Sequence, residues 1–258
     1  MELQLPTIAG AQLVGYVLVM CRVGGLFVLA PVFSGREIPL QAKVIVAGAI
    51  SFALEPIVMG GQTIPTGVEI VPLILKELLV GLAISLAIGV VAAGVQSGAA
   101  LLDTMIGFSF AALVDPMTQA QTAVTGQLYS IFTVLVFLLI GGDHLMIEGL
   151  AASYRLVPLG VLPSTDKLAA LAAQDLTQMF VIGLEVAAPV VIALGLVDIA
   201  FALIARSVPQ MNVFFVGIPA KILVGLGAIA ASLPFLTGHL EDLLQNAVYQ
   251  ALSSLRVH

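Results

Sequence analysis

Long apolar runs alternate with short polar or proline-containing segments along most of the chain. An α-helix that crosses the hydrocarbon core of a membrane needs about 20 predominantly apolar residues. Six runs are close to that length or longer, and each predicts an apolar helix. The predicted helices cover residues 8–31, 38–59, 78–102, 124–140, 176–205 and 219–236.

Two further segments have the mixed apolar and polar pattern of amphipathic helices. Residues 144–160 place Glu148 and Arg155 among apolar residues, which indicates a surface or re-entrant helix. Apolar residues between Leu240 and Leu255 recur at helical spacing, with acidic and amide side chains opposite them. The tail is therefore predicted to form an amphipathic helix after the sixth apolar run.

Three connections are expected to lie outside the helices. Residues 60–72 and 158–167 are rich in the glycine, proline and small polar residues of loops. Residues 103–125 are too polar and too interrupted to span a membrane, yet they carry an apolar cluster. Loops in water rarely present such a cluster, so we expect it to be buried in protein or to plug a cavity. The cluster consists of Phe108, Phe110, Leu113, Val114 and Met117.

The segment Ala205–Gly225 joins the last two apolar runs through a polar turn. Proline cannot continue a regular helix, because its ring displaces the carbonyl four residues earlier and it has no amide hydrogen. Pro209 is therefore expected to end the fifth helix and Pro219 to lie in the first turn of the sixth. The turn, here named the elbow, is expected on the cytoplasmic side because of its basic residues. The elbow consists of Arg206, Pro209, Gln210 and Asn212.

The two helices that leave the elbow each carry one charged residue at a similar height. Asp198 precedes Gln210 by twelve residues and Lys221 follows it by eleven, which places both roughly 18 Å from the turn at ~1.5 Å per residue. Charged groups among apolar helices tend to face inward and pair. One hypothesis is an ion pair between Asp198 and Lys221. In the other, Lys221 extends toward water and Asp198 meets a hydroxyl group or solvent.

Small residues recur every four positions along the third predicted helix. Small side chains at this spacing let the backbone of a neighbouring helix approach closely, which favours helix association in membranes. Because four residues exceed one helical turn, such a face winds slowly around the helix. The predicted packing face consists of Gly81, Ser85, Gly89, Ala93 and Ser97.

Composition narrows the class of protein. Of the 258 residues, 60% are hydrophobic and 9% are charged, and the mean hydropathy is +1.15. Soluble domains contain about 25% charged residues, so this chain is expected to lie in a membrane or in a helical assembly that buries most of it. No basic run with interleaved aromatic residues indicates nucleic acid binding, and the single Cys21 excludes an intrachain disulfide.

No catalytic or cofactor motif emerges from the polar residues. The three histidines are far apart in sequence, and residues 107–111 lack the closing glycine of a nucleophile elbow. Glu55, Glu185 and Asp198 could form a proton relay, although local hydrogen bonds are the favoured alternative. Arg22 lies inside an apolar run and is a candidate for a contact to a neighbouring subunit. We therefore predict neither enzymatic activity nor a cofactor.

Several stretches together resemble the FliR/SctT family of type III secretion export-gate subunits, over most of the chain. They are Arg22–Phe27 with Ala30–Phe33, Arg36–Pro39, Gly107–Ala111 leading to Val114–Pro116, and Arg206–Phe214 leading to Gly217–Lys221.

The resemblance implies an all-α, membrane-associated fold of bent helical hairpins that stack in an export gate. Kinks expected from proline chemistry at Pro31, Pro56 and Pro189 fit such a bent assembly. It implies one unit, with a FliP-like part over 1–175 and a FliQ-like hairpin with the amphipathic C-terminal helix over 176–258. Within the first part, residues 103–121 would act as a plug inside the pore.

The resemblance further implies a non-enzymatic subunit that forms a pore for unfolded export substrates with FliP-like and FliQ-like subunits. An FlhB-like partner is expected near the cytoplasmic turns, and the location is the bacterial inner membrane at the flagellar basal body. An alternative is a small-molecule or ion secondary transporter that uses Glu185, Asp198 and Lys221. An intramembrane enzyme is a third alternative, for which no motif is found.

Overall fold

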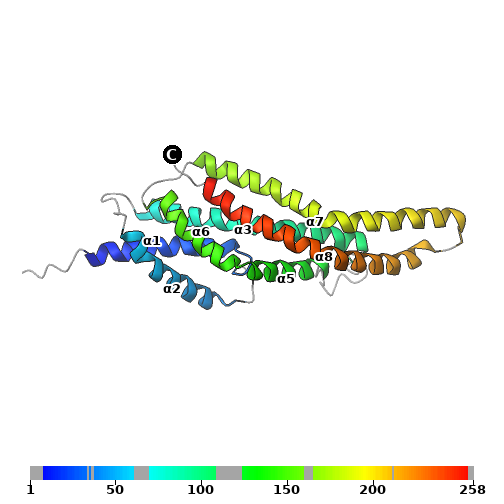
Figure 1. Cartoon of the computed structure of the whole chain (residues 1–258), viewed down its shortest axis with the longest axis horizontal. Coiled ribbons are helices and arrows are strands. Elements are labelled where there is room, and N and C mark those ends of the chain that lie inside the picture. Colours follow the sequence, from blue (N-terminus) through cyan, green and yellow to red (C-terminus); the bar gives the residue numbers. More distant parts are fainter. Residues whose placement is uncertain are drawn as a thin grey trace, which may run out of the picture. The chain divides into compact units, whose positions relative to one another are not determined.

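The computed structural model describes residues 8–33, 35, 38–60, 70–108, 124–159, 165–210 and 212–254. Every regular element in these ranges is an α-helix (Figure 1). The fold is therefore all-α, as predicted. The helices are α1 (Ile8–Leu29), α2 (Leu40–Met59), α3 (Ile70–Ile106), α5 (Val124–Leu139), α6 (Gly142–Leu156), α7 (Thr165–Ser207) and α8 (Val213–Ser254).

The apolar runs predict helix positions better than helix lengths. The predicted helices over 8–31, 38–59 and 124–140 are confirmed as α1, α2 and α5. Helix α3 starts at Ile70, inside the predicted loop over 60–72, and α7 starts at Thr165, eleven residues before the predicted residue 176. Pro72 lies in the first turn of α3, where proline is tolerated. The Ala-rich start of α7 favours helix without being strongly apolar.

The last third of the chain corrects two predictions. Helix α8 runs without a break from Val213 to Ser254 and contains both Pro219 and Pro234. Pro219 is thus the seventh residue of α8 and not part of its first turn, and the C-terminal amphipathic segment is not a separate helix. A proline inside a long helix removes one hydrogen bond and bends the chain locally, while the flanking turns keep the helix intact.

The prolines predicted to kink helices fall in two groups. Pro56 lies inside α2 and Pro189 inside α7, as expected. Pro31 lies beyond the end of α1 at Leu29, so its predicted kink within that helix is wrong. Pro209 follows the end of α7 at Ser207, which confirms that the helix stops there.

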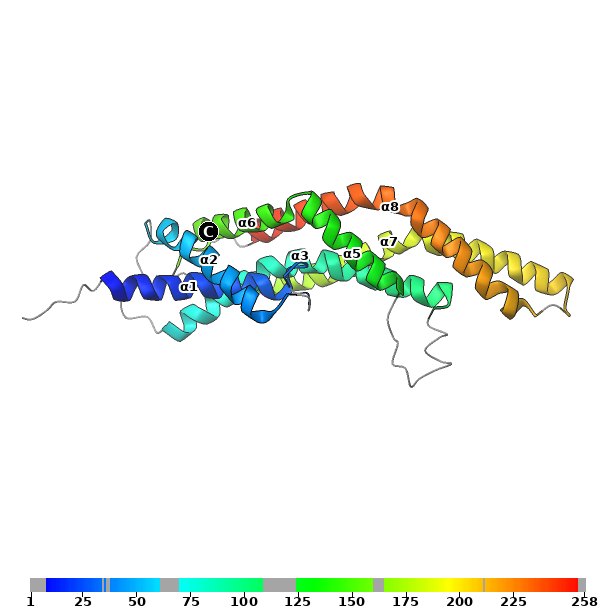
Figure 2. The same cartoon turned by 90° about the horizontal axis from the view of Figure 1, so that it is seen from below.

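The chain divides into two units, and three helices contribute to both. The first unit comprises residues 1–90, 141–176 and 244–258, and the second comprises 91–140 and 177–243. Leu18, Leu26 and Ile84 are among the fully buried core residues of the first unit. In the second unit, α7 and α8 run antiparallel and side by side from the elbow (Figure 2), and Val190 and Leu194 are fully buried.

Five helices in the described ranges are long and apolar enough to cross a membrane, or six if α5 and α6 together form one broken span. Gly141 separates α5 from α6 with a φ of +69°, in the left-handed region that glycine favours. The amphipathic character predicted for residues 144–160 holds in α6, where Glu148 is exposed and Leu150 is buried. Its apolar face packs within the chain, so α6 is more than a surface helix.

Candidate functional site

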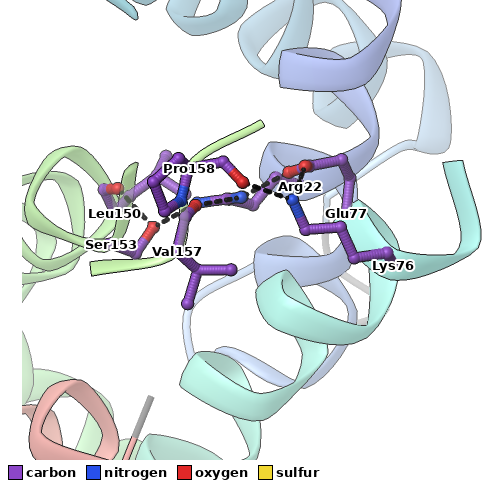
Figure 3. A network of polar contacts seen from close by, with 7 residues as sticks. All are labelled: Arg22, Lys76, Glu77, Leu150, Ser153, Val157 and Pro158. Carbon is purple, nitrogen blue, oxygen red and sulfur yellow. Dashed lines mark hydrogen bonds and ion pairs between the residues drawn. The ribbon is translucent and has the colours of Figure 1, made fainter. Parts of the chain in front are cut away.

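A fully buried ionic cluster lies in the first unit, between α1 and α3 (Figure 3). Arg22 Nε lies 2.5 Å from Glu77 Oε2, and Lys76 Nζ lies 2.8 Å from Glu77 Oε1. The three charged side chains have no exposed surface. One carboxylate thus stands between two cations, and its removal would leave two buried positive charges without a counter-charge.

Both cations also bind the C-terminal end of α6 (Figure 3). Arg22 donates to the Ser153 hydroxyl group and to the Val157 carbonyl group, each at 3.0 Å. Lys76 donates to the Pro158 carbonyl group at 2.7 Å. Helix C-termini carry partial negative charge and unpaired carbonyl groups, which cations satisfy. The cluster therefore joins three segments that are distant in sequence.

The expected contact of Arg22 with a neighbouring subunit is wrong. Its guanidinium group is buried in its own chain and stacks 4.0 Å from the centre of the Tyr154 ring. Lys76 and Glu77 directly precede the third predicted helix, over 78–102, and were not predicted as site residues. The sequence signal that could have predicted this cluster is the presence of three ionisable residues within or beside apolar runs, because buried charges need partners.

The first part of the predicted packing face contacts α1. A Cβ atom on Gly81 would collide with the carbonyl oxygen of Arg22. A Cβ atom on Gly89 would lie 2.9 Å from the carbonyl oxygen of Leu29. Ser85 donates a hydrogen bond of 3.1 Å to the Gly25 carbonyl group. The two helix backbones therefore approach as closely as small residues allow.

Farther along α3, within the second unit, the close contact shifts to the adjacent glycines Gly94 and Gly98. A Cβ atom on Gly98 would collide with the carbonyl oxygen of Gly183 in α7. Ala93 and Ser97 are half-buried, and the Ser97 hydroxyl group donates to the Gly94 carbonyl group at 2.7 Å. Gly183 was not identified from the sequence, because one glycine in an apolar helix carries no positional signal.

The hairpin of α7 and α8 contains the ion pair that the helix arithmetic suggested. Lys221 Nζ lies 2.5 Å from Asp198 Oδ1. The exposed fractions of these side chains are 25% for Lys221 and 47% for Asp198, so the pair lies at the surface of the hairpin rather than in its interior. The elbow residues Arg206, Pro209, Gln210 and Asn212 are all exposed.

The predicted plug is described only at its start. Phe108 is half-buried, whereas Phe110, Leu113, Val114 and Met117 lie outside the described residues. Asp103 lies in the last turn of α3, where its carbonyl group accepts a hydrogen bond of 3.0 Å from the Phe108 amide. Its buried carboxylate accepts a second hydrogen bond of 3.0 Å from the Thr125 amide in α5. This carboxylate caps the N-terminus of α5.

Two of the three carboxylates considered for a proton relay, Glu185 and Asp198, have separate basic partners. Glu185 Oε2 lies 3.0 Å from His239 Nε2, and Asp198 pairs with Lys221. Among the described residues, no group of three or more His, Cys, Asp or Glu side chains could hold a metal ion. Local pairing therefore explains the positions of Glu185 and Asp198 without a relay.

Long apolar helices, backbone contacts through glycine and paired charges define a helical membrane protein built for close packing. The family model described as "Bacterial export proteins, family 1" matches residues 13–247. The chain belongs to this family of bacterial export proteins, and within it to the FliR proteins.

Curated relatives agree with this assignment. The flagellar biosynthetic protein FliR of Bacillus subtilis (strain 168) is 34% identical over 196 residues, which cover 73% of this chain and 74% of the relative. The protein of the same name from Escherichia coli (strain K12) is 26% identical, with 72% and 71% covered. That of Caulobacter vibrioides is 25% identical, with 68% and 70% covered.

Proposed function

We propose that this chain is a structural and gating subunit of the flagellar type III protein export apparatus. Its family and its relatives, which are named flagellar biosynthetic proteins, support this role. It acts by packing against other subunits and catalyses no reaction. The transporter alternative is not favoured, because the family is one of export proteins and Glu185, Asp198 and Lys221 are already engaged in local pairs.

The observation that carries the proposal is the length of the exposed apolar surface on α7. Its candidate membrane-spanning segment covers 36 residues from Ala172 to Ser207, and only 17% of the 18-residue apolar window within it is buried. The segment is about 54 Å long at ~1.5 Å per residue. A bilayer core of ~30 Å accommodates about 39 Å of helix at a tilt of ~40°. The remaining apolar surface needs a protein neighbour.

The proposed neighbours are FliP-like and FliQ-like subunits, with which the chain forms the export pore in the bacterial inner membrane. Residues 1–175 are proposed to act as the FliP-like part and residues 176–258 as the FliQ-like hairpin. An FlhB-like subunit is proposed to contact the cytoplasmic elbow. Unfolded export substrates then pass through the pore, which residues 103–121 plug when no substrate is present.

Deletion of Gly107–Met117 is expected to cause ion leakage across the membrane while the complex still assembles. The deletion removes the apolar cluster of the plug but leaves Asp103, whose carboxylate caps α5. Leakage is measured as loss of membrane potential in cells or as ion flux from vesicles. Assembly is measured by co-purification of the FliP-like and FliQ-like subunits.

The matched control is the same deletion in cells that lack the FliP-like subunit, where no pore forms and no leak is expected. If the deletion variant assembles and no ion leakage is detected, the hypothesis that residues 103–121 plug the pore is wrong. Loss of specific uptake of a small solute, without a leak, would support a transporter instead.

A further inference from the structure

A cavity of about 510 Å³ opens between α7 and α8 within the second unit. It lies beside Pro189, and every lining residue comes from these two helices. Its polar lining residues are Glu185, Ser232 and His239, and its larger apolar ones are Val186, Phe235 and Leu236. A few polar groups in a mainly apolar cavity are typical of sites that orient a ligand.

Glu185 retains acceptor capacity beyond its contact with His239. An ionised carboxylate only accepts hydrogen bonds, so His239 Nε2 is the donor in the 3.0 Å contact with Oε2. This contact uses one of the two carboxylate oxygens. In addition, Pro189 has no amide hydrogen, so α7 supplies no regular helical donor to the Glu185 carbonyl group four residues earlier.

Ser232 adds a third acceptor to the lining. Its hydroxyl group donates its single proton to the Ile229 carbonyl group at 2.9 Å and also interacts with the buried Tyr129 hydroxyl group, which leaves one lone pair of its oxygen for a further donor. The lining thus offers hydrogen-bond acceptors, and its acidic residue is Glu185. The chemistry of the cavity therefore suits a cation with several hydrogen-bond donors.

The surroundings of Glu185 favour a further cation beside its pair with His239. Its side chain is 48% exposed, and large apolar side chains around it, such as Leu184 and Ile192, are exposed as well. Whatever covers this apolar surface removes water from the carboxylate too. A carboxylate without water is strongly disfavoured unless a positive charge and hydrogen bonds replace the water.

We propose that this cavity receives the side chain of a lysine from a neighbouring polypeptide of the export apparatus. The three donors of the ammonium group match the free carboxylate oxygen and carbonyl oxygen of Glu185 and the hydroxyl oxygen of Ser232. The methylene groups of the lysine contact Val186, Phe235 and Leu236. The proposal rests on the proposed function only because that function supplies a neighbour for the hairpin.

A second copy of this chain is not the favoured source of the lysine. The lysine side chains that the structure describes each contact an acceptor in their own chain: Lys43 binds the Gly35 carbonyl group, Lys76 binds Glu77, and Lys221 binds Asp198. The side chain of Lys167 lies outside the described residues. Because each described lysine already has an acceptor in its own chain, we assign the lysine to a different polypeptide, and the experiment below distinguishes it from a lysine of this chain.

Carbodiimide treatment of membranes that contain the assembled complex tests the proposal. The reagent joins a carboxylate to an amine in direct contact, without a spacer, and mass spectrometry identifies the linked peptides. We expect the peptide with Glu185 to be linked to a lysine of another polypeptide. The linkage should be lost in Glu185→Gln and retained in Glu148→Gln, which changes an exposed glutamate on α6.

Each other outcome overturns the proposal. Linkage of Glu185 to the amine of phosphatidylethanolamine would identify a lipid, and linkage to a lysine of this chain would identify a second copy. If the partners co-purify but Glu185 forms no link, the lysine contact is wrong while the proposed function stands. If no partner co-purifies, the proposed function itself is wrong and this contact is wrong with it.

Discussion

Glu77→Gln is expected to lower the free energy of unfolding by about 3–5 kcal/mol, the usual effect of breaking a buried ion pair. The substitution barely changes side-chain volume, so packing is preserved and only the charge is lost. Arg22 and Lys76, both fully buried, would then share a site without a carboxylate. Because they also hold the end of α6, the loss should loosen three segments together.

The matched control is Glu148→Gln, on an exposed position of α6, where a change within about 0.5 kcal/mol is expected. Both variants are compared with the original chain by unfolding in mixed micelles of increasing SDS content, followed by circular dichroism. Equal stability of the two variants would mean that the ionic cluster does not hold α1, α3 and α6 together.

Two glycine substitutions are expected to have opposite signs. Gly81→Ala places a methyl group against the carbonyl oxygen of Arg22 in α1, and such overpacking against backbone costs about 1–3 kcal/mol. Gly24→Ala, two residues from Arg22, meets no atom within 4 Å. It should stabilise α1 by roughly 0.5–1 kcal/mol, because alanine favours helix more than glycine.

Unfolding in the same mixed micelles measures both effects. If the two alanine variants are destabilised equally, glycine content in general, and not the close contact of α1 with α3, would explain the small-residue pattern. Stabilisation by Gly81→Ala would contradict the packing face at that position.

The regular geometry of the α-helix made the helix positions and some contacts between neighbouring helices predictable from the sequence. Apolar runs located six of the described helices, and a mixed apolar and polar pattern located α6 as a surface or re-entrant helix. Helices α3 and α7 were expected to be shorter, and α8 was expected as two separate helices. The rise per residue was sufficient to suggest the contact of Asp198 with Lys221, since only a short turn separates them in the chain. Regular spacing likewise identified Gly81 and Gly89 as contact positions.

Contacts between distant segments were beyond such reasoning. Arg22 meets Glu77 across 55 positions and Ser153 across 131, and no periodicity within one helix encodes that proximity. The cavity beside Glu185 depends on how α7 and α8 bend around their prolines. Proline indicates that a helix is perturbed but does not indicate the direction of the bend.

The central claim is that the exposed apolar hairpins of this chain pack against other polypeptides of an export pore. Native mass spectrometry of complexes purified through a tag on the full chain, produced at its natural level, tests this claim most directly. We predict one assembly that contains FliP-like and FliQ-like subunits in fixed whole-number ratio to this chain. A uniform population of the chain alone, bound only to lipid and detergent, would contradict it.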